Sequence, residues 1–181
     1  MPRIPKLLQT PRLTLVPPRR SDAREVNRAV LESYRELHPW MPWARRRPTL
    51  AQTGGFCRKA AWDFAAHREF SFLIRLRESD ELIGSAGLVR GDRTVPKFEI
   101  GYWLRTRFVG HGYAAEAVVA LEQFARRYLH VRRLEIRTDA RNVSSTAVAK
   151  RAGFKLEAVL RQDARDNRGR LRNTQIIVKL C

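Results

Sequence analysis

The sequence of 181 residues contains little cysteine and no long hydrophobic run. Its two cysteines, Cys57 and Cys181, are too few for a disulfide framework or for a zinc site made of four cysteines. No apolar run approaches the ~20 residues of a membrane span. The N-terminal segment MPRIPKLLQTPRL lacks the apolar centre of a signal peptide. We therefore expect a cytoplasmic protein with no membrane partner.

Acidic residues and lysines are also scarce. Eighteen Asp and Glu face 36 Lys and Arg, which gives a formal net charge of +18, and only six of the basic residues are lysines. An excess of arginine can follow from GC-rich codons. It can also indicate an acidic partner, such as nucleic acid, the ribosome or an acidic protein. Composition alone leaves both explanations open.

The length predicts a single domain over residues 1–181. Apolar periodicity predicts a strand at 13–16, a helix from Ser21 or Asp22 to about Leu37, and a second helix from Thr49 to about His67, interrupted at Gly54-Gly55. The further elements expected are strands at 70–77, 82–89 and 97–104, a loop at 91–96, a helix at 113–128, a strand at 133–138, a helix at 144–152 and a final hairpin of 155–161 with 175–180. This order predicts a mixed α/β fold, with a mostly antiparallel central sheet and flanking helices.

A glycine-rich loop joins the expected strand 97–104 to the helix that starts at Tyr113. Gly110 and Gly112 permit positive φ angles and close approach of a ligand to the backbone. The free N–H groups and partial positive charge of a helix N-terminus suit a pyrophosphate, and Arg107 adds a full charge. A plain strand-to-helix turn would show the same pattern. The loop matches neither the Walker A nor the dinucleotide-binding motif.

Two motifs resemble those of the GNAT N-acetyltransferases. The first is R-x-x-G-x-G at 107–112, preceded by EIGYWL at 99–104, and the second is NVSSTAVAKRAGFKLEAVLR, which starts at Asn142. This second motif, the opening TPRLTL and the Trp-Met-Pro-Trp stretch are similar to the ribosomal-protein acetyltransferases of the RimJ/RimL type. The resemblance spans roughly residues 10–180.

The resemblance implies that acetyl-CoA is the co-substrate and enters where strands 97–104 and 133–138 splay apart. It implies that the acceptor amine attacks the thioester directly, with no acyl-enzyme. The residues that it assigns to acetyl-CoA are Trp103, Leu104, Arg107, Val109, Gly110, His111, Gly112, Tyr113, Ala114 and Asn142. The backbone amides of 109–114 would hold the pyrophosphate, and Asn142 would lie near the pantetheine.

Two residues are the candidates for catalysis. Many relatives carry a tyrosine acid seven residues after the asparagine, where this chain has Ala149, so we assign proton delivery to Ser145. Glu99 is the candidate base, with Asp163 as a second choice. Each has a structural alternative, because Ser145 could bond its own helix backbone and Glu99 could pair with an arginine.

Aromatic residues of the N-terminal region are the candidates for acceptor binding. Tyr34, Trp40 and Trp43 can line the acceptor or only pack the core, and the run 45–47 of three arginines can attract an acidic substrate. An N-terminal α-amine titrates near ~8, against ~10.4 for lysine, and needs little help from a base. The leading hypothesis is transfer to an acidic protein N-terminus, with ribosome association possible and either a monomer or a homodimer.

Two other functions stay open. One is acetylation of a small-molecule amine or antibiotic, although few acidic residues are available to bind a polycation. The other is a non-catalytic module that binds the ribosome or nucleic acid, which the basic charge favours and the intact glycine loop opposes. Metal binding is not expected, since no histidine has the spacing or acidic partner of a metal ligand.

Overall fold

The computed structural model describes residues 4–89 and 94–181. An eight-stranded sheet has the order β1-β2-β3-β4-β5-β6-β8-β7. The strands are β1 (Leu8–Gln9), β2 (Leu13–Val16), β3 (Phe70–Leu76), β4 (Leu82–Val89), β5 (Lys97–Leu104), β6 (Arg133–Asp139), β7 (Lys155–Arg165) and β8 (Leu171–Leu180). The helices are α1 (Ala23–Glu32), α2 (Tyr34–Leu37), α3 (Leu50–Ala65), α4 (Tyr113–Leu129) and α5 (Val143–Arg151), with short 3₁₀ turns η1 (Arg20–Asp22), η2 (Pro42–Ala44) and η3 (Thr106–Phe108).

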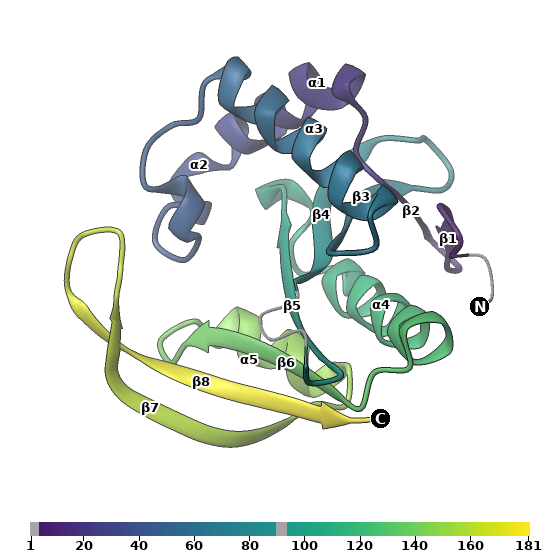
Figure 1. The fold of residues 1–181 in the computed structure, drawn as a ribbon. Coiled ribbons are helices and arrows are strands. Elements are labelled where there is room, and N and C mark those ends of the chain that lie inside the picture. The colour runs from purple at the N-terminus through teal and green to yellow at the C-terminus, as the bar shows by residue number, and fades with distance from the viewer. Residues whose placement is uncertain (1–3, 90–93) are drawn as a thin grey trace.

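Helices cover both faces of the sheet, as Figure 1 shows. Because side chains alternate along a strand, Phe72 and Leu73 of β3 join two different clusters. Phe72 packs in the larger core with α4, and Leu73 packs in a second cluster with α1 and α3. Phe72 also meets the rings of Phe64 and Phe124 edge-on, with centroids 5.3 and 5.5 Å apart. These contacts fix α4 against the sheet and so position the loop that precedes it.

The expected mixed, mostly antiparallel sheet is confirmed, and three local predictions are wrong. The helix expected to reach Leu37 breaks at Ser33, which is buried and accepts a hydrogen bond from the Thr106 N–H at 2.9 Å. Helix α3 runs unbroken through Gly54-Gly55, since a helical glycine costs only about 1 kcal/mol. The final hairpin is longer than expected, and β1 was not expected. Residues 91–93 of the predicted loop 91–96 lie outside the described residues.

Strands β5 and β6 form the single parallel pair in the described part of the sheet. They pair only at Lys97 with Arg133, Phe98 with Leu134 and Glu99 with Glu135. Beyond this point β5 stays with β4 as far as Leu104, and β6 stays with β8 as far as Asp139. The two strands therefore diverge after Glu99, which confirms the splay that the family resemblance implied.

Candidate active site

The diverging strands leave two backbone edges without a strand partner in the described sheet. These edges belong to residues 100–104 of β5 and 136–139 of β6. Free N–H and C=O groups on such an edge can pair with an extended ligand, as an added strand would. Trp103 and Leu104 lie at the open end of β5, where the resemblance assigns the pantetheine arm.

The glycine loop follows directly. Gly110 and Gly112 have φ angles of +91° and +82°, a conformation that favours glycine, and Gly112 caps the N-terminus of α4. The Val109 N–H donates to the Thr106 carbonyl at 3.1 Å. In the described hydrogen bonds, the N–H groups from Gly110 to Ala114 have no acceptor. The free amide cradle therefore starts at Gly110, one residue later than expected.

Arg12 holds this loop from the N-terminal side, and the sequence analysis did not identify it. Its guanidinium pairs with Glu116 of α4 at 2.7 Å and donates to the His111 carbonyl at 3.0 Å. It also lies 4.6 Å from the centre of the Tyr113 ring. The loop is thus tied to the start of α4 before any ligand binds.

Arg107 has different partners from those expected. Its guanidinium pairs with Glu81, and its Nε lies 3.5 Å from Glu32. The buried Arg105 meets the same two carboxylates, at 2.5 Å for Glu32 and 3.0 Å for Glu81. Both charges are therefore matched within the fold. The positive potential of the loop comes instead from its free amides and from the α4 N-terminus.

A pair of hydroxyls bridges β5 and α5. The Tyr102 hydroxyl lies 2.9 Å from Ser145 Oγ and 3.1 Å from the Ser145 carbonyl, to which it can donate. Asn142 caps α5 by accepting the Ser145 N–H at 3.0 Å. Burial raises the pKa of Tyr102 to about 12, so this hydroxyl keeps its proton at neutral pH. Ser145 Oγ is thus bonded to another side chain, and Ala149 is buried in the core.

The sequence analysis did not identify Tyr102. Its position within EIGYWL is the signal that could have found it. Side chains alternate along a strand, so Tyr102 points to the face opposite that of Glu99 and Trp103.

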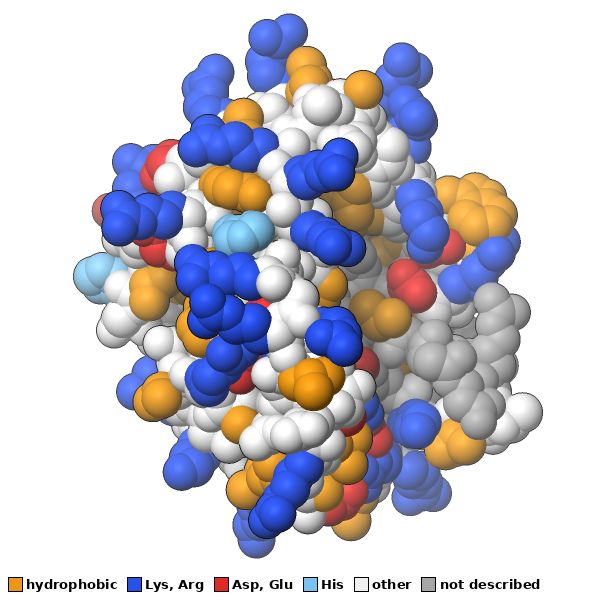
Figure 2. All heavy atoms as spheres, turned by 90° about the vertical axis from the view of Figure 1, so that its left-hand side faces the viewer, with side chains coloured by type: hydrophobic (Ala, Val, Ile, Leu, Met, Phe, Trp, Pro, Cys, Tyr) orange, Lys and Arg blue, Asp and Glu red, His pale blue; other side chains and the backbone are white. Residues whose placement is uncertain are grey.

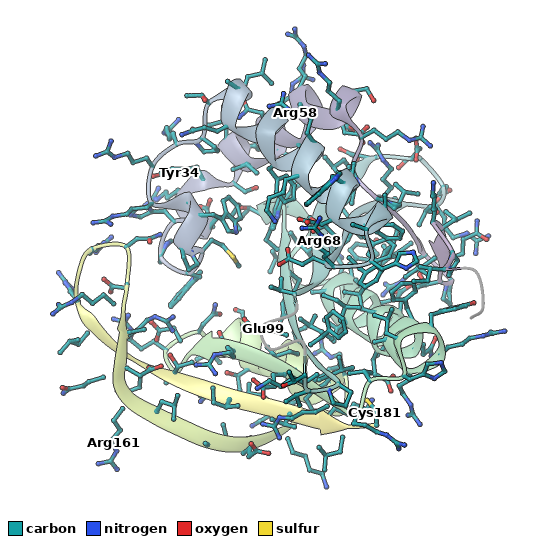
Figure 3. The ribbon with its side chains drawn as sticks, viewed as in Figure 1. Tyr34, Arg58, Arg68, Glu99, Arg161 and Cys181 are labelled. Carbon is teal, nitrogen blue, oxygen red and sulfur yellow. The ribbon has the colours of Figure 1, made fainter. Side chains whose placement is uncertain are left out.

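Glu99 belongs to a partly buried charged cluster. Glu135 of β6 lies directly opposite Glu99 in the last residue pair of the β5–β6 ladder. Arg137 of β6 lies 4.0 Å from Glu135 and 3.9 Å from Asp163 of β7. Burial raises the pKa of Glu99, and the Glu135 charge adds to this while Arg137 opposes it. A carboxylate with a raised pKa accepts a proton more readily than a carboxylate with the ordinary value. Figure 3 shows Glu99 where β5 passes β6, between Tyr34 above and Arg161 below.

The candidate acceptor residues differ in how they are held. Trp43 meets Trp103, with ring centroids 6.1 Å apart, which brings it to the open end of β5. The Trp40 side chain is exposed. The Tyr34 hydroxyl bonds His38 Nδ1 at 3.2 Å, and its ring lies under Arg47. Tyr34 therefore stabilises the turn that carries the tryptophans.

The tip of the β7–β8 hairpin reaches this same turn. The Asn167 side chain donates to the carbonyls of His38 and Met41, at 2.5 and 2.8 Å. The contact joins the C-terminal half of the sheet to the α2–η2 segment, and Figure 1 shows the tip of the β7–β8 hairpin approaching that segment. We call this contact the Asn167 bridge. Sequence patterns did not indicate it, because it joins residues more than 120 positions apart.

The described residues contain neither a candidate metal centre nor a candidate membrane span. No three His, Cys, Asp or Glu side chains there are grouped so that they could hold a metal ion. No helix there is long and apolar enough to cross a membrane.

The split sheet and the amide cradle at a helix N-terminus define an acyltransferase of the kind that uses a CoA thioester. The family model for the acetyltransferase (GNAT) domain matches residues 12–155. The chain therefore belongs to the GNAT acetyltransferase family, and its domain is an acetyl-CoA-dependent N-acetyltransferase.

Curated relatives agree with this class. The ribosomal-protein-serine acetyltransferase of Escherichia coli strain K12 is 30% identical over 125 residues, which cover 68% of this chain and 70% of that protein. The uncharacterized N-acetyltransferase p20 of Bacillus licheniformis is 34% identical over 100 residues. In that case the match spans only 56% of the relative's length.

Solved structures share the fold. A RimL ribosomal L7/L12 α-N-protein acetyltransferase in complex with coenzyme A has a TM-score of 0.87 at 24% identity, and covers 98% of this chain and 97% of its own. The microcin C7 self-immunity acetyltransferase MccE, in complex with acetyl-CoA and AMP, has a TM-score of 0.86 at 23% identity, with 95% and 94% covered. Enzymes with such different names share this backbone, so the fold leaves the acceptor open.

Proposed function

We propose that this domain acetylates the N-terminal α-amine of a protein, with an acidic, ribosomal-protein-like N-terminus as the acceptor. The observation that carries the proposal is the similarity to the ribosomal-protein-serine acetyltransferase, which extends over two thirds of both chains. The net charge of +18 supports an acidic acceptor, because opposite charge accelerates encounter.

Acetyl-CoA binding is assigned to the open edge of β5 and to the glycine loop. The backbone of Trp103 and Leu104 pairs with the pantetheine arm, and the free amides from Gly110 to Ala114 take the pyrophosphate. Asn142 uses its oxygen to cap α5, which leaves its amide NH₂ to donate to the arm. Arg107 acts indirectly, since its ion pairs with Glu81 and Glu32 anchor the turn before the loop.

Glu99 receives the proton of the acceptor amine. The neutral amine attacks the acetyl carbon, the new C–N bond forms, and the carbon–sulfur bond breaks. An α-amine needs a base only weakly at neutral pH, since its pKa lies near ~8. Glu99, with its pKa raised by burial, is suited to take the proton from the nitrogen as the bond forms. Asp163 is engaged with Arg137 and is the weaker candidate.

Ser145 delivers a proton to the leaving thiolate. Its own proton is replaced from the Tyr102 hydroxyl, 2.9 Å away, which recovers one from solvent. A serine hydroxyl alone is a weak acid, and a second hydroxyl in line supports the transfer by bonding the oxygen that gives up its proton. Charge is balanced, because the thiolate gains one proton and the amine loses one.

The acceptor enters on the Glu99 face of β5. Trp43 and Trp103 form an apolar wall there, and Trp40 extends it toward solvent. Tyr34 and the Asn167 bridge hold the turn that carries both N-terminal tryptophans. Figure 2 shows many Lys and Arg side chains and few Asp and Glu on the side of the molecule that carries this turn and the hairpin.

The test is an acetyl-transfer assay on a matched pair of peptides. Both have an acidic sequence that starts with serine and contains one internal lysine, and one has its N-terminus blocked. We expect thiol release with the free peptide only, and mass spectrometry should place the acetyl group on the α-amine. Acetylation of the blocked peptide at lysine, or turnover only on small amines such as polyamines and aminoglycosides, would overturn the proposed acceptor. Calorimetry with acetyl-CoA tests donor binding separately.

A further inference from the structure

A basic groove runs between α1 and α3, on the outer side of the N-terminal helices. Two adjoining hollows, of about 470 and 530 Å³, share Arg24 and Leu50 in their linings. The first is also lined by Arg20 and Arg58, and the second by Arg28. We call these four arginines and the space between them the α1–α3 groove. Figure 3 shows Arg58 at the helical end of the molecule, well separated from Glu99.

The four arginines of the groove have no carboxylate partner among the described ion pairs and hydrogen bonds. All four are exposed. The acidic residues of the same segment pair with arginines outside the groove. Asp22 and Glu25 meet Arg75 of β3, at 3.9 and 2.5 Å. Glu32 meets Arg105 at 2.5 Å. The carboxylates of the segment are thus paired with arginines outside the groove, while the four groove arginines stay unpaired. Glu32 also lines the second hollow, so the first hollow, between Arg20, Arg24 and Arg58, carries no carboxylate in its lining.

This separation of charge has a cost within the free protein. Arg24 and Arg28 lie four residues apart in α1, and Arg20 lies four residues before Arg24 in the turn η1. Like charges at four-residue spacing in a helix destabilise it by about 0.2–0.5 kcal/mol per pair. A bound anion would relieve the repulsion. The guanidinium group also forms paired hydrogen bonds to phosphate oxygens.

The spacing of the charges favours one kind of anion. Four residues of α-helix rise about 6 Å, so Arg24 and Arg28 present two positive charges at a step comparable with that between successive phosphates of an extended RNA strand. Arg20, in the preceding turn η1, adds a third charge to this row. Arg58 faces this row from α3. The groove between them has a small, apolar lining from Ala23, Ala51 and Gly54, which lets a chain approach closely.

We propose that the α1–α3 groove binds the phosphate backbone of single-stranded RNA. This binding surface is separate from the acetyl-CoA and acceptor sites, and its action does not depend on the proposed acceptor. Recognition through phosphates alone predicts binding that is independent of base sequence and strongly dependent on salt.

The experiment measures fluorescence anisotropy of a labelled short oligouridylate with the full chain, over a salt series from about 50 to 200 mM. The double variant Arg24→Ala/Arg58→Ala removes two groove charges. The control Arg132→Ala/Arg151→Ala removes two exposed arginines of other elements, and both variants carry the same net charge. Thermal melting and acetyl-CoA calorimetry confirm that each variant is folded.

We expect the groove variant to bind RNA about 10-fold more weakly at low salt, and the slope of log K against log salt to fall by about 1.4, at about 0.7 per lost contact. The control variant should keep the slope of the parent. Equal losses in both variants would show diffuse attraction by net charge and overturn the groove. A polyglutamate peptide that binds as tightly as the RNA, and loses as much in the groove variant, would overturn the assignment to RNA.

Discussion

The two faces of β5 carry different chemistry. On one face Tyr102 and Ser145 form a neutral pair of hydroxyls, bonded at 2.9 Å and facing α5. On the other face Glu99 shares a charged cluster with Glu135 and Arg137. One strand thus separates a group that can give a proton from a group that can take one. Because alternate side chains point to opposite faces, three residues along the chain are enough to separate the two functions.

This difference teaches where catalysis can be lost without loss of the fold. The hydroxyl pair and the carboxylate lie at the edge left open where β5 and β6 part, and only the Tyr102 ring packs against the border of the larger core. Substitutions there should change rates more than stability. The four variants below test the division, from the largest expected effect to the smallest.

Ser145→Ala should give the largest loss, a kcat lower by about 100-fold, because positioned proton transfer typically contributes 10²–10⁴-fold. The KM for acetyl-CoA should change little, since the backbone N–H that Asn142 accepts is kept. Steady-state kinetics on the serine-starting peptide provide the measurement. Ser144→Ala is the matched control and should keep the parent rate. Similar losses in both variants would argue for a structural effect on α5.

Glu99→Gln should lower kcat by about 10- to 100-fold at neutral pH. In the parent, the rate should fall as the pH drops through the raised pKa of Glu99, because the protonated carboxyl can accept nothing. The variant should lack this acid limb. Its control is Glu157→Gln, an exposed carboxylate that pairs with Arg133. An unchanged pH–rate profile would remove Glu99 from the reaction.

The substitution Glu99→Gln should raise the stability of the fold at neutral pH, although it lowers kcat. A carboxyl whose pKa is raised by folding favours the folded state below its unfolded pKa, and this contribution is lost as the pH rises through the folded value. The Glu99→Gln variant should therefore gain stability relative to the parent on going from acid to neutral pH. Thermal melting at both pH values checks this. If the variant were more stable than the parent only at acid pH, burial would not disfavour the ionised form of Glu99, and the explanation would be wrong.

Tyr102→Phe should lower kcat by about 10-fold and keep most of the binding of acetyl-CoA. Loss of its hydrogen bonds should also cost about 1 kcal/mol of stability. The conservative change leaves Ser145 in place, so a lower kcat with an unchanged KM for acetyl-CoA is the readout that a merely structural role would not produce. Tyr128→Phe, in α4, is the control. A rate equal to the parent would confine proton delivery to Ser145 and solvent.

Asn167→Ala should have the smallest effect, a rise of about 3-fold in the KM for the peptide with kcat nearly unchanged. The bridge holds the turn that carries Trp43 and contributes about 1 kcal/mol, but it touches neither reacting group. Arg168→Ala, at the same hairpin tip, is the control. A change in kcat as large as that of Ser145→Ala would mean that the bridge positions the acid–base groups.

Much of the fold could be predicted from local patterns. Alternation marked the strands at 70–77, 82–89 and 97–104, and one apolar face marked α4. Patterns misjudged Ser33, where a long-range bond to Thr106 breaks a helix that its own sequence would continue. They also missed the length of the final hairpin, because its outer part is exposed and carries no apolar alternation.

The candidate site also combines features that depend on local sequence with features that depend on long-range contacts. The glycine loop, Asn142 and Ser145 are read from motifs, since each depends on residues close in sequence. The sequence by itself thus determined the family, the amide cradle and the order of the elements. Tertiary structure alone decided that Arg107 pairs with Glu81, that Tyr102 bonds Ser145, and that Asn167 bonds the turn at residues 38–41. These pairings join distant residues, and only the packing of the whole chain brings their atoms within hydrogen-bond reach.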